Sequence, residues 1–154
     1  MKDKKKNTIQ VTAEGKVFFD TNILVYFVDE KDPRKQVIAK ELIEKAVQNQ
    51  NGIISTQSLQ EFYNVITTKM KCPKDKAKEL VEMFSDIFSV TKISVSLILN
   101  AIDISIKTSF SFWDSLILSA ANDTGCIIVY SEDMNDGQIV SGTKILNPFT
   151  ECAA

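Results

Sequence analysis

Two acidic residues lie within segments of this sequence that are otherwise uncharged. Asp20 interrupts the mostly apolar run VFFDTNILVYF at residues 17–27, and Asp114 is the only ionisable residue within residues 109–122. A buried carboxylate is destabilising by several kcal/mol unless another group pairs with it or it binds a cation. Both segments are apolar enough to be buried, so something must neutralise these two charges.

Each of these acids also has a structural explanation that involves no chemistry. Asp20 is a good N-cap for a short helix expected to begin at Asn22. Asp114 follows Ser111 by three residues, and this pair can form a variant of the capping box, in which Glu or Gln is more usual at the last position. Neither explanation excludes a second role, because a carboxylate has lone pairs for several partners.

Two further acids follow strand-like segments. Glu61 lies on the helix predicted after the strand Gly52–Ser55, and Asp133 follows a later predicted strand. In an open parallel sheet, ligands bind at the carboxyl ends of the strands. The fold therefore predicts that these two acids approach the first two. Taken singly, Glu61 is explained as a solvated helix residue and Asp133 as a turn residue.

Grouped carboxylates repel one another and raise each other's pKa unless a cation neutralises them. The chain has no histidine and a single arginine, Arg34, so a basic partner would have to be a lysine. Carboxylate oxygens suit Mg²⁺ or Mn²⁺, and such an ion can promote phosphodiester hydrolysis. Thr21, Asn22 and Ser131 lie beside the acids and can orient them or donate hydrogen bonds to a phosphate.

The composition excludes several kinds of site. Without histidine, Ser-His-Asp, Cys-His and paired-histidine ribonuclease mechanisms are excluded. Three cysteines without a CxxC pair predict neither a disulfide framework nor structural zinc. The net charge of −2 gives no overall attraction to nucleic acid. The segment KMKCPKDKAK, with Lys69 and Lys71, can bind an RNA backbone locally or can be a solvated helix junction.

The apolar pattern predicts one α/β domain over residues 16–150 after a flexible, lysine-rich tail at residues 1–15. Strands are expected at 16–19, 52–55, 89–93, 126–130 and 143–146, and helices at 22–27, 33–47, 56–66, 73–84, 94–107 and 111–124. This alternation implies a mostly parallel sheet covered on both faces. We expect the helix at 33–47 to have an apolar face formed by Val37, Ile38, Leu42, Ile43, Ala46 and Val47. We also expect Trp113 in the core, with stacking on a nucleobase as the alternative.

Four segments together resemble PIN-domain proteins, in particular VapC-like toxin ribonucleases. They are VFFDTN, the acidic helix position in STQSLQEFYNVITTK, FSFWDSLILSAA, and YSEDMNDGQ followed by ILNPF. The resemblance extends from about Lys16 to Phe149. It implies a three-layer α/β/α sandwich with a mostly parallel central sheet and a metal-dependent endoribonuclease site.

The resemblance also implies which residues form the site. The four acidic positions of the family fall, in chain order, on Asp20, Glu61, Asp114 and Asp133. Of these, Asp20, Asp114 and Asp133 are expected to bind Mg²⁺ or Mn²⁺, and Glu132 and Asp136 are alternatives for the fourth position. The residues expected to contact the substrate are Thr21, Asn22, Ser131, Lys69 and Lys71.

The partners implied by the resemblance are RNA, such as tRNA or rRNA, a small antitoxin protein, and a second copy of the chain in a homodimer. No apolar run approaches the roughly 20 residues of a membrane helix and no secretion signal is recognisable, so we expect a cytoplasmic protein without membrane contact. Two alternatives stay open. One is a catalytically silent RNA-binding or scaffold domain, and the other is an aspartyl-phosphate enzyme with Asp20 as nucleophile.

Overall fold

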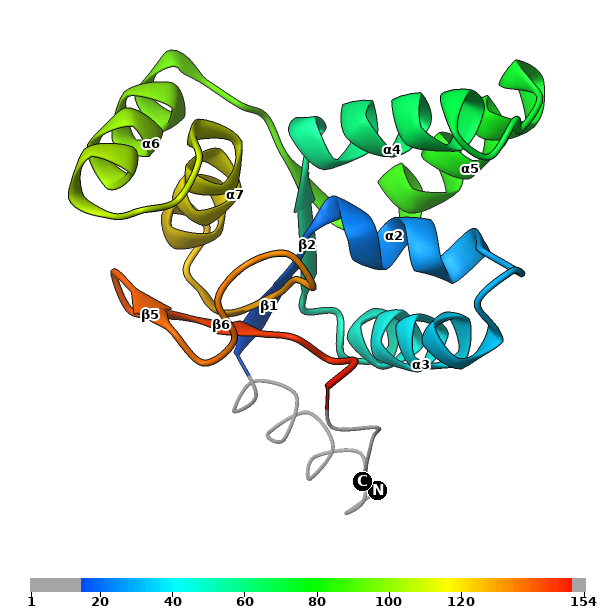
Figure 1. Cartoon of the computed structure of the whole chain (residues 1–154), viewed down its shortest axis with the longest axis horizontal. Helices are drawn as coiled ribbons and strands as arrows, with labels where there is room; N and C mark the ends of the chain where they lie inside the picture. The colour runs from blue at the N-terminus through cyan, green and yellow to red at the C-terminus, as the bar shows by residue number, and fades with distance from the viewer. Residues whose placement is uncertain (1–14, 151–154) are drawn as a thin grey trace, which may run out of the picture.

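The structure, a computed structural model, describes residues 15–150 and contains one six-stranded sheet between two layers of helices (Figure 1). The strands are β1 (Lys16–Phe19), β2 (Gly52–Ser55), β3 (Ser89–Thr91), β4 (Cys126–Tyr130), β5 (Ile139–Val140) and β6 (Thr143–Leu146). The helices are α2 (Thr21–Val28), α3 (Pro33–Asn49), α4 (Thr56–Thr68), α5 (Lys74–Ile87), α6 (Val95–Lys107) and α7 (Phe112–Asp123). The predicted tail lies, except for Gly15, outside the described residues.

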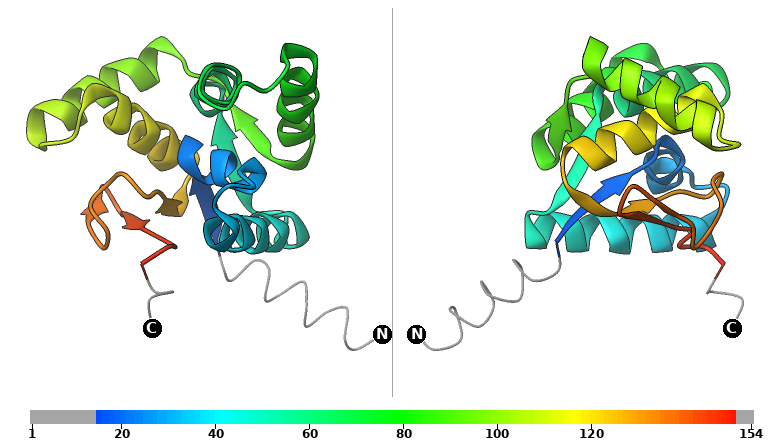
Figure 2. Two further views of the ribbon diagram at one scale, coloured as in Figure 1. Left: turned by 45° about the vertical axis from the view of Figure 1, so that its right-hand side comes forward. Right: turned by 90° about the vertical axis from the view of Figure 1, so that its left-hand side faces the viewer.

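The sheet has the order β3-β2-β1-β4-β6-β5, and only the pairing of β5 with β6 is antiparallel. Successive side chains of a strand point to opposite faces. In β1, Val17 and Phe19 therefore pack in the core beneath α2–α5, while Phe18 packs beneath α6 and α7. The two helix layers lie on opposite sides of the sheet (Figure 2). The predicted three-layer, mostly parallel α/β fold is confirmed.

The carboxyl ends of the central strands meet at one edge of the sheet. Phe19 of β1 lies opposite Tyr130 of β4, and the next residue, Asp20, donates its backbone N–H to the carbonyl of Tyr130 at 3.0 Å. Helices α2 and α4 begin directly after β1 and β2, because Asp20 and Ser55 cap them. This edge therefore gathers the starts of two helices and the loop that follows β4.

Two expectations about α3 are wrong. Val37 is 54% exposed and Val47 is 38% exposed. Ile43 and Ala46 of the predicted face are buried, together with Ala39, and Ile38 and Leu42 are partly buried. With 3.6 residues per turn, Val37 lies nearly opposite this buried stripe and Val47 lies beside it, so both valines remain exposed.

Helix α6 has an apolar outer face. Val95, Leu99, Ile102 and Ile106 are spaced by four, three and four residues, and they are 40% to 74% exposed. Their spacing places them on one side of the helix, away from the side that packs on α7. Within residues 15–150 no single helix is long and apolar enough to span a membrane, and α6 and α7 reach that length only as a pair bent by 120°.

Candidate active site

A pocket of about 460 Å³ opens at the carboxyl edge of the sheet. Its lining includes all four predicted acids, Asp20, Glu61, Asp114 and Asp133. They come from the end of β1, the second turn of α4, the first turn of α7 and the loop after β4. The fold thus brings together acids that are far apart in the sequence.

Asp20 is the buried member of this group, with 6% of its surface exposed. Its Oδ1 accepts the backbone N–H of Thr21 at 2.7 Å, and its Oδ2 accepts the hydroxyl of Ser131 at 2.8 Å. The pKa of Asp20 is raised from 3.8 to about 7: burial raises it most, these two hydrogen bonds lower it, and the charges of Glu61 and Asp114 raise it. Asp20 is therefore both the cap of α2 and an acid that no basic side chain of residues 15–150 pairs with.

Glu61 is held by two neutral donors. Thr21 Oγ1 donates to Glu61 Oε2 at 2.9 Å, and Gln57 Nε2 donates to Glu61 Oε1 at 2.8 Å. Gln57 lies one turn earlier on α4, is almost fully buried and also donates to the carbonyl of Trp113 at 3.2 Å. Gln57 therefore fixes Glu61 relative to the start of α7, a role that sequence reasoning missed because glutamine at this position belongs to no motif.

Asp114 lies in the first turn of α7 and is half-buried. Its backbone N–H donates to Ser111 Oγ at 3.1 Å, so Ser111 caps the helix as predicted. Burial raises the pKa of the Asp114 carboxyl, the hydrogen bond with Ser111 lowers it, and the charges of Asp133 and Glu61 raise it. The expectation of a fully buried acid is wrong, since complete burial in α7 begins only at Ser115.

Asp133 is exposed on the loop after β4 and is tied to α2. Asn22 Nδ2 donates to Asp133 Oδ2 at 3.0 Å, and the backbone N–H of Asp133 donates to Ser131 Oγ at 3.2 Å. Of the alternatives, Glu132 is paired with a lysine, and Asp136 lies outside the pocket and accepts a backbone N–H from Asn147 at 2.9 Å. The geometry thus favours Asp133 as the fourth acid of the site.

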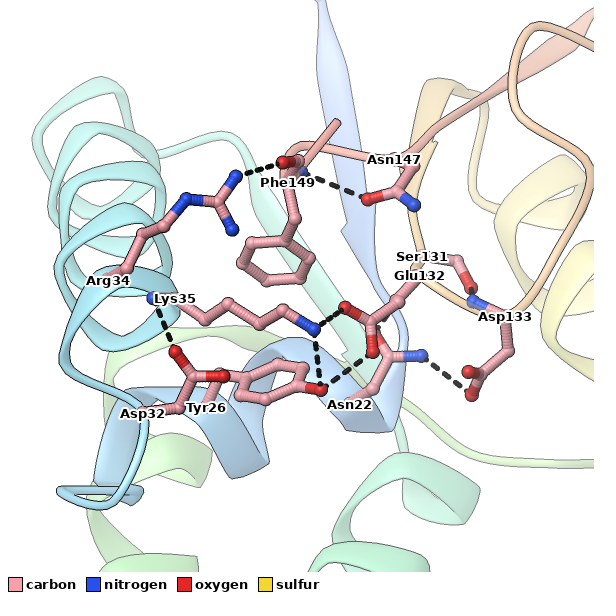
Figure 3. A network of polar contacts seen from close by, with 10 residues as sticks. All are labelled: Asn22, Tyr26, Asp32, Arg34, Lys35, Ser131, Glu132, Asp133, Asn147 and Phe149. Atoms are coloured by element: carbon pink, nitrogen blue, oxygen red, sulfur yellow. Dashed lines mark hydrogen bonds and ion pairs between the residues drawn. The ribbon is translucent and has the colours of Figure 1, made fainter. Parts of the chain in front are cut away.

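A cluster around Glu132 holds this loop in place (Figure 3). Glu132 accepts hydrogen bonds from Lys35 Nζ and, at 2.6 Å, from Tyr26 Oη, and Lys35 Nζ also donates to Tyr26 Oη at 3.2 Å. The Lys35 ammonium lies 5.4 Å from the centre of the Phe149 ring. Sequence reasoning missed this cluster because its members come from α2, α3, the loop and the C-terminal segment. The nearest signal is that Glu132 precedes Asp133.

The remaining predicted residues are divided between the pocket and the surface. Lys69, at the C-terminal end of α4, lines the pocket together with Thr21 and Asn22. Lys71 is exposed and does not line it. Trp113 lines the pocket and is 62% exposed, so its predicted place in the core is wrong. It lies in the first turn of α7, ahead of the buried part of the helix.

The chemistry of the donors fits a hard divalent cation. Within residues 15–150, none of the four acids takes part in an ion pair, and carboxylate oxygens are the ligands that such ions prefer. Gln57 Oε1, also in the pocket, is buried without a hydrogen-bond donor in the part of the chain described. No three His, Cys, Asp or Glu side chains among residues 15–150 are arranged so that together they could hold a metal ion. The fit to a cation therefore lies in the donor types and their charge, not in a preformed coordination geometry.

Three solved structures share this fold. VapC20 of Mycobacterium tuberculosis, described as a sarcin-ricin loop cleaving toxin, has a TM-score of 0.61 and 19% identity, over 76% of this chain and 89% of that chain. A DNA-bound VapBC structure from Salmonella typhimurium has a TM-score of 0.64 and 16% identity, over 85% and 96%. VapBC2 of Rickettsia felis, bound to a promoter DNA fragment, has a TM-score of 0.60 and 16% identity, over 84% and 96%.

Two comparisons of the sequence with known proteins differ in their outcome. A comparison with curated protein sequences finds no match. Residues 17–135, by contrast, match the PIN domain family. This range covers most of the chain and contains all four acids that line the pocket. The chain therefore belongs to the PIN domain family.

Proposed function

We propose that this protein is an endoribonuclease that depends on Mg²⁺ or Mn²⁺. The observation that carries the proposal is the convergence of Asp20, Glu61, Asp114 and Asp133 on one pocket, with no ion pair to any of them within residues 15–150. Such a group of like charges is stable only if the acids are protonated or a cation joins them. Membership of the PIN domain family supports the nuclease assignment.

In this proposal Asp20, Asp114 and Asp133 hold the ion, which when bound would neutralise charge on the phosphate and activate the attacking water. Glu61 would accept a proton from that water, and the hydrogen bonds from Gln57 and Thr21 that orient its two oxygens support this role. Lys69 at the rim of the pocket attracts the RNA phosphates. Ser131 and Asn22 keep the acids oriented through their hydrogen bonds.

We further propose that the protein is the toxin of a toxin–antitoxin pair, acts in the cytoplasm on tRNA or rRNA and is inhibited by a small antitoxin. The shared fold of the VapBC structures supports an antitoxin partner, and the description of VapC20 supports a ribosomal RNA loop as a kind of target. The apolar outer face of α6 supports a homodimer, because four exposed aliphatic side chains on one face are unusual on a monomer surface.

Cleavage of total cellular RNA tests the proposal. The wild-type protein should cut RNA in Mn²⁺ or Mg²⁺ and not in EDTA, and Asp114→Asn should lower the rate by about a hundredfold or more. Asp123→Asn is the matched control, because Asp123 is exposed at the other end of α7 and outside the pocket. Cleavage at the undiminished wild-type rate in EDTA or by Asp114→Asn would refute the metal-carboxylate mechanism.

Two further measurements, of RNA binding and of phosphorylation at Asp20, separate the alternatives. RNA binding without cleavage of any RNA would favour a catalytically silent scaffold. A phosphoaspartate trapped on Asp20 would favour an aspartyl-phosphate enzyme. Against the second alternative, haloacid-dehalogenase-type sites need an acid two residues after the nucleophile, where this chain has Asn22. The Asn22 side chain donates a hydrogen bond to Asp133.

A further inference from the structure

The only tryptophan of the chain lies at the rim of the acidic pocket. Trp113 is 62% exposed, although the seven residues Ser115–Ala121 of the same helix are all buried. An indole ring carries a large apolar area that most proteins cover at least in part. Its exposure beside Asp114 points to a ligand that covers the ring when the pocket is in use.

The backbone and the ring of Trp113 are both held in place. Gln57 Nε2 donates to the carbonyl of Trp113 at 3.2 Å and to Glu61 Oε1 at 2.8 Å, so one amide fixes the tryptophan relative to a site acid. The Phe112 ring packs edge-on against the indole, with the ring centres 5.1 Å apart and the planes at 69°. A ring held in this way can present a flat face with little loss of entropy on binding.

The chemistry of the surrounding pocket indicates what lies on that face. The pocket combines the indole with a group of carboxylates suited to a phosphate-bound cation, and with Lys69, a cation able to contact a neighbouring phosphate. A nucleotide is the ligand that carries a flat aromatic group and a phosphate side by side. An apolar peptide would cover the indole but would leave the carboxylates and Lys69 without partners.

We infer, on the basis of the proposed ribonuclease function, that Trp113 is a stacking platform for an unpaired nucleobase next to the phosphate bound at the acidic site. A base can lie flat on a side chain only when it is removed from its own stack. The substrate at this position is therefore a single-stranded or looped segment. Stacking accepts every base, so Trp113 sets a requirement for an unpaired base and does not select its identity.

Intrinsic fluorescence tests this inference directly, since Trp113 is the single tryptophan. We would titrate a short single-stranded RNA of mixed sequence into Asp114→Asn protein, which keeps the tryptophan and should not cut the probe. Single-stranded RNA should quench the emission, and the same sequence as a duplex should leave it unchanged. We would also titrate a series of probes in which a different single nucleotide lacks its base. Quenching should be lost only for the probe whose missing base is the one that stacks on Trp113.

Binding of labelled RNA, followed by fluorescence anisotropy, supplies the second measurement. Trp113→Leu should weaken binding about ten- to a hundredfold, while Trp113→Phe should restore most of it, because phenylalanine also stacks. Val37→Ala is the control, since Val37 is 54% exposed on α3 and outside the pocket. Circular dichroism would verify that each variant is folded.

The outcomes separate this inference from the proposed function. Unchanged fluorescence at saturating RNA, or unchanged RNA binding by Trp113→Leu, would overturn the stacking role even if wild-type protein cleaves RNA. If Trp113→Leu loses binding to a protein partner but keeps its RNA binding, the stacking role is equally overturned and the ring is assigned to a protein interface. If the wild-type protein cleaves no RNA but the abasic probes still show quenching that depends on position, the catalytic proposal is rejected and the stacking role of Trp113 stands.

Discussion

Asp20 should make the metal-free protein less stable as the pH rises. Its pKa is raised from 3.8 to about 7 in the folded chain. Between these values the folded protein retains a proton that the unfolded chain has released, so the free energy of unfolding falls with increasing pH. The contribution is therefore most favourable below about pH 4 and is lost as the pH passes about 7. One pKa unit corresponds to about 1.4 kcal/mol, so the shift corresponds to about 4 kcal/mol in total.

Asp20→Asn should remove this pH dependence. Asparagine has nearly the same shape, is neutral at every pH used and can still accept the Thr21 N–H that caps α2. Between about pH 5 and pH 8 the wild-type protein should lose roughly 3 kcal/mol of stability relative to the variant. At pH 8 in EDTA, Asp20→Asn should accordingly be the more stable protein, although it has lost a site residue.

Urea unfolding followed by circular dichroism at several pH values measures this difference. EDTA is present throughout, so that no cation neutralises the site. Asp123→Asn, an exposed position on α7, shows how much the removal of one surface charge alone changes stability. Parallel pH dependences for wild type and Asp20→Asn would refute the view that Asp20 is a buried acid that no basic side chain of residues 15–150 neutralises.

Three further predictions concern the cation, the loop and the outer face of α6. Mn²⁺ or Mg²⁺ should raise the melting temperature of the wild-type protein at pH 8 and not that of Asp20→Asn, because binding to the folded state alone stabilises it; equal shifts in differential scanning fluorimetry would contradict this. Lys35→Met should lower Mn²⁺ affinity about ten- to a hundredfold in calorimetry, because Glu132 loses the lysine that helps to hold the loop carrying Asp133. Lys45→Met, at an exposed position, is the control. Equal Mn²⁺ affinities of wild type and Lys35→Met would exclude a positioning role for Lys35. Leu99→Asp should convert a dimer into a monomer in sedimentation experiments, because it places a charge in the apolar stripe of α6; a dimer that persists would assign self-association to another surface.

Much of the fold could be predicted because local signals agree with it. Short apolar strands occur where the pattern places them, and the helices that follow Asp32, Ser55, Ser94 and Ser111 are capped by the side chains of these residues. These signals depend on a few neighbouring residues. The two-residue strand β5 carries too little pattern to be recognised, and it forms only because β6 pairs with it.

The four acids of the site could be predicted from the sequence, but their arrangement could not. Asp20 and Asp133 follow strands, Glu61 lies on the helix after a strand, and Asp114 lies in the first turn of a helix. The parallel sheet brings these four positions to one edge. The partners of the acids could not be predicted, since Gln57 and Lys35 become part of the site only through tertiary contacts. Trp113 was misplaced for a related reason: helix periodicity describes which residues share a face, but not where along its length a helix enters the core.

The order of the strands also has a consequence for how the protein is made. Asp20 is among the first residues of the domain to be synthesised, but it lies between β2 and β4, and its backbone bonds to Tyr130. The contacts that orient it, from Ser131 and through Asn22 to Asp133, join residues separated by 111 positions. A growing chain thus has no assembled pocket until β4 and its loop have emerged and paired with β1. On the proposed function, the ribosome that synthesises this nuclease is not exposed to an active site until β4 and the loop after it have been synthesised.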